Sequence, residues 1–265
     1  MSKGQESGYP ALLRMRPHVV VSNVGVALGV AWAGVWLIDI LDVYERETPL
    51  WLNLFNDAPV EWTQWFLLGL TIAASGYLSA WLRRDARQAP SSFYLLIAVG
   101  TALMLIEEAG DIRHSLRLVA GAEPAVAFAG WRTSMLIEGP YFALLAAIPL
   151  YALVRYGRPI WASRRTRPYL IAGFGLYGLA AGASTLRMVG ENYATLGSWI
   201  DRTLLGGRWP IPDDRTQEWG HYFLVDSAIE ESVELMAAAC FLAMVLAFAH
   251  EHEREQLSAT STGKS

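Results

Sequence analysis

The sequence predicts an all-α fold: a polytopic membrane helical bundle with six transmembrane helices and both termini in the cytoplasm. Of the 265 residues, 53% are hydrophobic and only 17% are charged, whereas about 25% are charged in a typical soluble domain. Six apolar segments have roughly the 20 residues that a helix needs to cross a bilayer. Arginines gather in two of the short loops between these segments, which indicates the cytoplasmic side.

The six apolar segments define one transmembrane domain over residues 19–250. The predicted spans are 19–41, 62–82, 92–111, 133–156, 169–190 and 222–249. Residues 1–18 are polar, with no recognisable signal peptide, and are expected to form a cytoplasmic leader. Residues 251–265 are expected to form a disordered cytoplasmic tail. The loop after the second span carries Arg83, Arg84 and Arg87, and the loop over 155–167 carries five more arginines.

The connections on the opposite side of the membrane are longer and contain fewer arginines. Residues 42–61 mix acids with Trp51 and Phe55, as an interfacial segment does. Residues 194–205 predict a short amphipathic helix that ends at Gly206 and Gly207, before a turn over 210–214.

The stretch 103–114 (LMLIEEAGDIRH) is the main functional signal, because an apolar run leads directly into five charged residues. A second stretch, 225–235 (VDSAIEESVEL), repeats Asp226, Glu230 and Glu234 at intervals of four residues, which one helix face accommodates. Carboxylates this close to hydrocarbon are expensive and mark functional sites. Counted along the predicted spans, acids from several helices reach the same depth, in the outer third of the membrane.

This acidic layer predicts a metal site. Carboxylates with an imidazole suit one or two ions of Fe, Mn or Zn. The predicted ligands are Glu107, Glu108, Asp111, His114, Glu138, Glu191, Glu230, Glu231 and Glu234, with Arg113 and Arg187 as charge partners. The set resembles the ligand inventory of di-metal carboxylate bundles, in which two helices each supply Glu-x-x-His. It departs from that pattern at Glu234, where His is expected. His221 is the alternative imidazole ligand, but it lies about two helical turns from Glu230.

Two blocks also resemble a family of uncharacterised bacterial multi-span membrane proteins. These blocks are EEAGDIRHSL at 107–116 and IEESVELMAA at 229–238. The family has His-Glu where this chain has Arg113 and His114, so the match is incomplete. The resemblance implies that the acidic residues matter and implies no particular activity. The location expected for the chain is a bacterial-type plasma membrane, with the site toward the extracytoplasmic side.

Three functions remain open from the sequence. A metal site facing the extracytoplasmic side would make the chain a membrane oxidoreductase or hydrolase acting on a lipid-like substrate. Without a metal, the acids would serve a proton- or cation-coupled transporter. They could instead join the chain to other membrane subunits or to a second copy in a larger complex.

Several other classes of function are not indicated. Gly175, Gly178 and Gly182 predict a close helix-packing face, and no strand precedes them as a nucleotide loop requires. No basic face for nucleic acid is apparent. Cys240 is the only cysteine, which excludes an intrachain disulfide.

Overall fold

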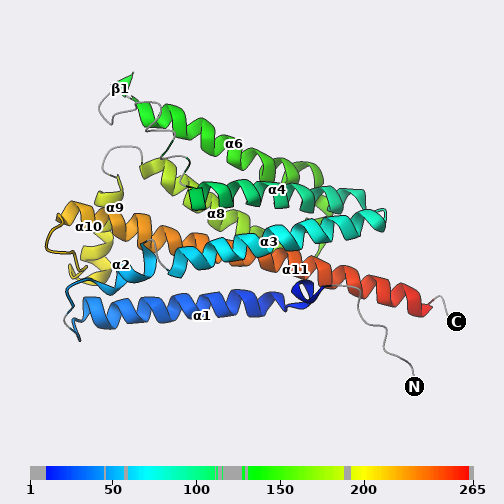
Figure 1. Cartoon of the computed structure of the whole chain (residues 1–265), viewed down its shortest axis with the longest axis horizontal. Helices are drawn as coiled ribbons and strands as arrows, with labels where there is room; N and C mark the ends of the chain where they lie inside the picture. Colours follow the sequence, from blue (N-terminus) through cyan, green and yellow to red (C-terminus); the bar gives the residue numbers. More distant parts are fainter. Residues whose placement is uncertain are drawn as a thin grey trace.

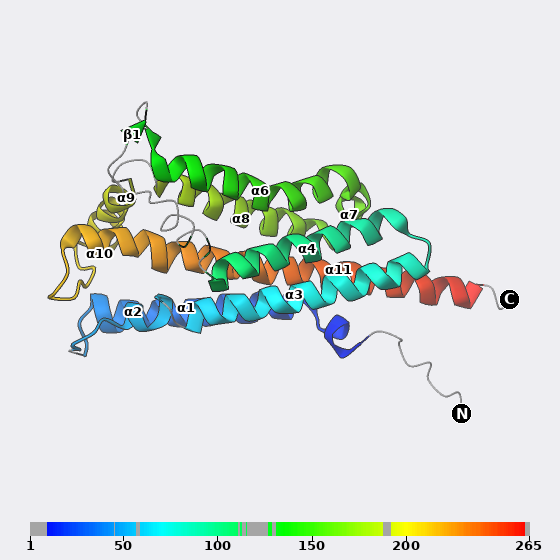
Figure 2. The same cartoon turned by 45° about the horizontal axis from the view of Figure 1, so that its top comes forward.

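The computed structural model describes residues 10–44, 46–56, 59–110, 112, 115, 127–128, 131–187 and 192–262; for 127–128, 131–139, 185–187 and 259–262 it describes the backbone alone. The chain forms a bundle of long helices whose axes run roughly parallel (Figures 1 and 2). In chain order the elements are η1 (Ala11–Arg14), α1 (Pro17–Val35), η2 (Trp36–Ile40), α2 (Leu50–Phe55), α3 (Pro59–Arg84), α4 (Gln88–Gly110), β1 (Ala127–Phe128), β2 (Trp131–Arg132), α6 (Thr133–Tyr156), α7 (Arg158–Ala162), α8 (Arg167–Arg187), α9 (Asn192–Ile200), η3 (Asp201–Leu205), α10 (Gln217–Phe223), η4 (Leu224–Glu230) and α11 (Glu231–Thr262). η1 is a 3₁₀ turn, η2, η3 and η4 are π-helical, and β1 and β2 form one short antiparallel pair.

Within the described part of the chain, four helical stretches are long and apolar enough to cross a membrane. They are Pro17–Ile40, Leu50–Arg84, Gln88–Gly110 and Gln217–Ser258. They coincide with the first, second, third and sixth predicted spans, so the prediction of an all-helical membrane bundle is confirmed at this level. α6 and α8 lie at the fourth and fifth predicted spans, and the apolar part of α6, Pro140–Tyr156, is shorter.

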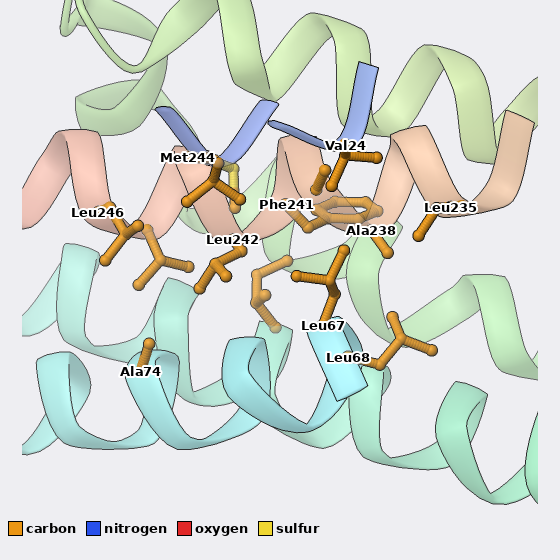
Figure 3. Packing of buried hydrophobic residues seen from close by; sticks show 14 of the residues in the cluster. Val24, Leu67, Leu68, Ala74, Leu235, Ala238, Phe241, Leu242, Met244 and Leu246 are labelled. Carbon is orange, nitrogen blue, oxygen red and sulfur yellow. The ribbon is translucent and has the colours of Figure 1, made fainter. Parts of the chain in front are cut away.

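α11 is the central helix of the bundle. Every residue from Ala237 to Ala249 is buried, and α1, α3 and α8 all pack against this helix. A helix that is apolar on all sides is expected to be surrounded by other elements. Figure 3 shows Leu242 of α11 on the side that faces Leu67 and Ala74 of α3, and Met244 on the opposite side of α11.

The other long helices surround α11 in two layers: α1, α3 and α8 pack directly on it, whereas α4 and α6 lie farther out. α3 and α4 form an antiparallel hairpin through Asp85–Arg87, and α6 packs on the far side of α4. α8 packs on α11 from another direction, and α6 and α8 make few contacts with each other. The helices that carry the candidate residues are therefore held mainly by α4 and α11.

Short helices cover the end of the bundle where α2, α9 and α10 lie (Figure 1). Trp51 is fully buried between Trp209 and Trp219, and its indole N–H donates to the Pro210 carbonyl at 3.0 Å. The predicted helix over 194–205 is present as α9 and η3. It ends at Gly206 in the left-handed conformation, with φ of 70°, which glycine adopts without strain.

The opposite end of the bundle is held by polar contacts to the last turns of α11. His252 is 3% exposed and its Nε2 lies 2.7 Å from Asp85 Oδ2, and Gln256 donates to the same oxygen. Arg87 pairs with Glu255 at 2.8 Å, where both side chains are largely exposed. α11 continues to Thr262, so residues 251–262 of the predicted tail are helical.

The glycine face predicted on α8 is not a packing contact within the described chain. A Cβ atom added at Gly175, Gly178 or Gly182 would have no neighbour within 4 Å. α8 approaches α11 at Gly173 instead, where an added Cβ would lie 3.3 Å from the Phe241 ring. The prediction from the glycine spacing was wrong because small residues mark close packing only where another helix actually crosses them.

Candidate functional site

A cavity of about 550 Å³ lies inside the bundle, enclosed by residues of α3, α4, α6, α8, η4 and α11. Seven acidic side chains line it: Glu61, Glu107, Glu108, Asp226, Glu230, Glu231 and Glu234. Its volume is in the range of cavities that enclose small organic ligands. The two acidic stretches of the sequence, 110 and more residues apart, thus contribute to the same wall.

The cavity contains most of the predicted site residues that the structure describes. Glu107, Glu108, Glu230, Glu231 and Glu234 all line it. The other predicted members lie outside the described residues or are described by their backbone only: Asp111, Arg113, His114 and Glu191 belong to the first group, and Glu138 and Arg187 to the second.

Two of the acids are held by donors from a neighbouring helix. The Tyr141 hydroxyl of α6 donates to Glu107 Oε2 of α4 at 2.5 Å. The Gln64 amide of α3 donates to Glu234 Oε2 of α11 at 3.0 Å, and Gln64 is completely buried. Hydrogen bonds to a charged group in a buried place are strong, so each pair fixes a carboxylate and joins two helices.

Glu230 is held by two hydroxyl groups. Tyr193 of α9 donates to its Oε2 at 2.6 Å, and Ser184 of α8 donates to its Oε1. Glu230 is the last residue of the π-helical segment η4, which continues directly into α11. π-helical turns often occur at functional sites, and this one precedes two further acids, Glu231 and Glu234.

Glu231 differs from these three carboxylates. Its Oε2 atom is buried and has no hydrogen-bond partner among the described residues. The indole N–H of Trp65 is likewise buried without a partner there. Both residues line the cavity. Because buried polar atoms are nearly always hydrogen-bonded, these two point to a ligand or to water within the cavity.

The described acids do not converge on one point. Among the described residues there is no group of three or more His, Cys, Asp or Glu side chains close enough together to hold a metal ion. The acids line the same part of the cavity wall without three of them meeting at one point among the described residues. The predicted metal site depends on Asp111, His114, Glu138 and Glu191 as well, so it stays a prediction.

Two further residues, an acid at the end of the first predicted span (Asp39) and the histidine His221, have structural roles. Asp39 accepts hydrogen bonds from the backbone N–H groups of Leu50 and Trp51, at 2.8 and 2.9 Å, and thereby caps α2. His221, the alternative imidazole ligand, lies 3.2 Å from Asp201. Both contacts lie where the short helices cover the bundle, and neither Asp39 nor His221 lines the cavity.

The cavity has no described basic side chain in its wall: none of its lining residues is Lys, Arg or His. Several carboxylates enclosed together repel one another unless they bind protons or a cation. Aromatic rings of Phe55, Trp65, Phe142 and Tyr177 stand among them, and ring faces also attract cations. Glu231 is the acid among them whose Oε2 has no hydrogen-bond partner in the described part of the chain.

Sequence reasoning missed several residues that shape this cavity. Gln64, Tyr141 and Tyr193 each hold a carboxylate, and Trp65 and Tyr177 line the wall. Gln64 could have been noticed, because it is an uncharged amide inside an apolar predicted span. The tyrosines gave no such signal, since aromatic residues are common at the ends of membrane helices.

No protein-family model, no curated protein and no solved structure matches the chain.

Proposed function

We propose that this chain is an integral membrane protein that binds a cation in the carboxylate cavity and works as a proton- or cation-coupled transporter. The observation that carries the proposal is that seven acidic side chains line one cavity, and that one of them, Glu231, has a buried oxygen with no hydrogen-bond partner among the described residues. Carboxylates within membrane helices mark ion pathways and proton relays.

The proposed topology has six transmembrane helices, with α6 and α8 as the fourth and fifth. Both have lengths near the 20 residues that a bilayer requires. The arginine-rich loops at 83–87 and 155–167 then lie together in the cytoplasm, with both termini. In a bacterial-type plasma membrane the acidic part of the cavity would lie toward the extracytoplasmic side.

Exchange between protons and a cation follows from the hydrogen bonds in the wall. Glu107, Glu230 and Glu234 are held by neighbouring donors, which stabilise each carboxylate in place. Glu231 has an oxygen without such a donor, so we assign it the exchangeable position. A cation bound there would displace a proton, because one carboxylate cannot hold both charges favourably.

The test uses liposomes with a transmembrane pH gradient and an enclosed pH-sensitive dye. Sodium, potassium, tetramethylammonium and tetraphenylphosphonium are added outside, one at a time. We expect at least one of them to dissipate the gradient faster with the protein than in protein-free liposomes, and we expect Glu231→Gln to remove the difference. If none of the four does so, the transporter proposal is rejected.

A metal-dependent membrane enzyme is the second candidate function. It is favoured by one observation: Glu108 and Glu231 line the same cavity, and the predicted ligands Asp111 and His114 follow Glu108 by only three and six residues. Fe, Mn or Zn would there activate water or oxygen against a lipid-like substrate. Elemental analysis of the purified protein tests this. One or two equivalents of metal that disappear in a Glu108→Ala, Glu231→Ala double variant would support it, and their absence from protein purified without chelators would count against it.

A further inference from the structure

The cavity is amphipathic along its length. On α4, on α8 and on η4 with α11, the polar lining residues come mainly at the end near α9 and α10, and the apolar ones lie farther along; the lining residues of α6 are all apolar. On α4 the order is Ile97, Thr101, Met104, Glu107 and Glu108. Since the helices run roughly parallel (Figure 1), these sequences define an acidic end and an apolar end.

The same order appears on α11 and α8. On α11, Glu230, Glu231 and Glu234 precede the lining residue Phe241. On α8, which runs in the opposite direction, Phe174 and Tyr177 precede Ser184. A small inorganic ion would need only the acidic end, so the apolar end requires a different explanation.

The cavity wall reaches the outer surface between α6 and α8. Gly178 of α8 and Leu150 of α6 both line the cavity, yet Gly178 is exposed and Leu150 is 50% exposed. α6 and α8 make few contacts with each other. In a membrane this surface faces lipid, so the opening leads sideways into the bilayer.

We infer that the ligand of this cavity is an amphiphilic organic cation, a protonated amine or an onium ion with an apolar body, that enters from the lipid between α6 and α8. This inference deepens the proposed function and rests on it for the role of the carboxylates. The positive group lies at the acidic end, beside Glu231 and Trp65, and the apolar body lies against Phe174, Pro149 and Phe241.

Each part of the ligand has a matching part of the wall. The unpartnered Oε2 of Glu231 supplies the counter-charge, and the ring of Trp65 offers a face to the cation. The apolar lining shields the hydrocarbon body of the ligand from water, which favours binding. About 550 Å³ accommodates a molecule with several rings, which far exceeds the size of a bare ion.

The experiment compares two probes of nearly the same shape and opposite charge. Tetraphenylphosphonium and tetraphenylborate are titrated separately into the purified full-length protein in detergent, and binding is measured by calorimetry. We expect saturable binding of the cation and no saturable binding of the anion. Equal binding of both ions would show that the cavity is apolar but does not select for positive charge, and would overturn the inference.

Two variants of the cavity and one matched control locate the binding. Glu231→Gln keeps the shape but removes the charge, and we expect the cation to bind roughly tenfold more weakly or worse. Gly178→Leu fills the opening, and since nothing lies within 4 Å of an added Cβ atom there, the helix tolerates it. Gly29→Leu on the exposed face of α1 has equally free space and does not line the cavity.

We expect Gly178→Leu to weaken or slow tetraphenylphosphonium binding severalfold, while Gly29→Leu binds like the wild type. If neither Glu231→Gln nor Gly178→Leu differs from Gly29→Leu, the ligand occupies another site and the inference is wrong. Gradient dissipation by sodium or potassium without tetraphenylphosphonium binding would retain the transporter and reject this ligand class. Binding of tetraphenylphosphonium without any dissipation would retain the site and reject transport.

Discussion

The Tyr193 hydroxyl donates to Glu230 Oε2 at 2.6 Å, and both side chains are more than nine-tenths buried. The bond connects α9, one of the short helices at the end of the bundle, to the segment that carries the acids of the cavity. It therefore positions the cover of the bundle relative to the acidic end of the cavity.

Tyr193→Phe should destabilise the protein by about 1–3 kcal/mol, because it leaves a buried carboxylate oxygen without one of its donors. Thermal unfolding in detergent measures this effect. The control is Tyr222→Phe, which removes a hydroxyl that lies 3.4 Å from Asp226 Oδ1, at the long limit for a hydrogen bond. We expect a smaller loss for Tyr222→Phe, and equal losses for the two variants would contradict the role given to Tyr193.

The Gln64–Glu234 pair allows a double-mutant test. Gln64→Leu alone should lower the unfolding free energy by about 1–3 kcal/mol, since it leaves the buried carboxylate of Glu234 without this hydrogen-bond donor. A second change, Glu234→Leu, should restore part of that loss, because removing both polar partners is often nearly neutral. Unfolding measurements on the two single variants and the double variant give the coupling energy. A coupling energy near zero would mean that the 3.0 Å contact does not stabilise the bundle.

The sequence indicated the helices well because their signals are local. Apolar length located the four long apolar stretches, and a glycine pair located the end of the helix over α9 and η3. The described acids of 103–114 and 225–235 reach one cavity because both stretches lie at the ends of helices that border it. The depth of these acids depends only on the length of each helix and on the direction in which it crosses the bundle, and both can be predicted from the sequence.

The partners of those acids could not be predicted from the sequence. Gln64, Tyr141 and Tyr193 contact the acids because of the rotation of each helix about its own axis, and this rotation is set by packing. The π-helical segment η4 adds a further rotation just before Glu231, which a regular helical repeat does not anticipate. The glycines of α8 misled for the same reason: their spacing does not specify which neighbour, if any, crosses them.

Gly197 should tolerate no side chain. An added Cβ atom would lie 1.9 Å from the backbone carbonyl oxygen of His221, and a backbone atom cannot move aside as a side chain does. We expect Gly197→Ala to separate α9 from α10 and to lower the unfolding temperature strongly. Gly175→Ala, where an added Cβ meets nothing within 4 Å, should be neutral or stabilising by up to about 1 kcal/mol through helix propensity. The prediction fails if the two variants unfold at the same temperature.

The polar contacts at the far end of α11 should differ in strength according to their burial. His252 is 3% exposed and contacts Asp85 at 2.7 Å, whereas the side chains of Arg87 and Glu255 are 43% and 51% exposed. Exposed ion pairs contribute at most about 1 kcal/mol, so Arg87→Ala should change the unfolding temperature little. His252→Ala removes a buried ring and its hydrogen bond and should cost about 2–4 kcal/mol. Thermal unfolding at low and high salt separates the two contacts: salt should weaken only the contribution of Arg87, because water and ions reach that pair and not the buried one. A larger loss for Arg87→Ala than for His252→Ala would show that the exposed ion pair, rather than the buried contact, holds the end of α11 to the α3–α4 loop.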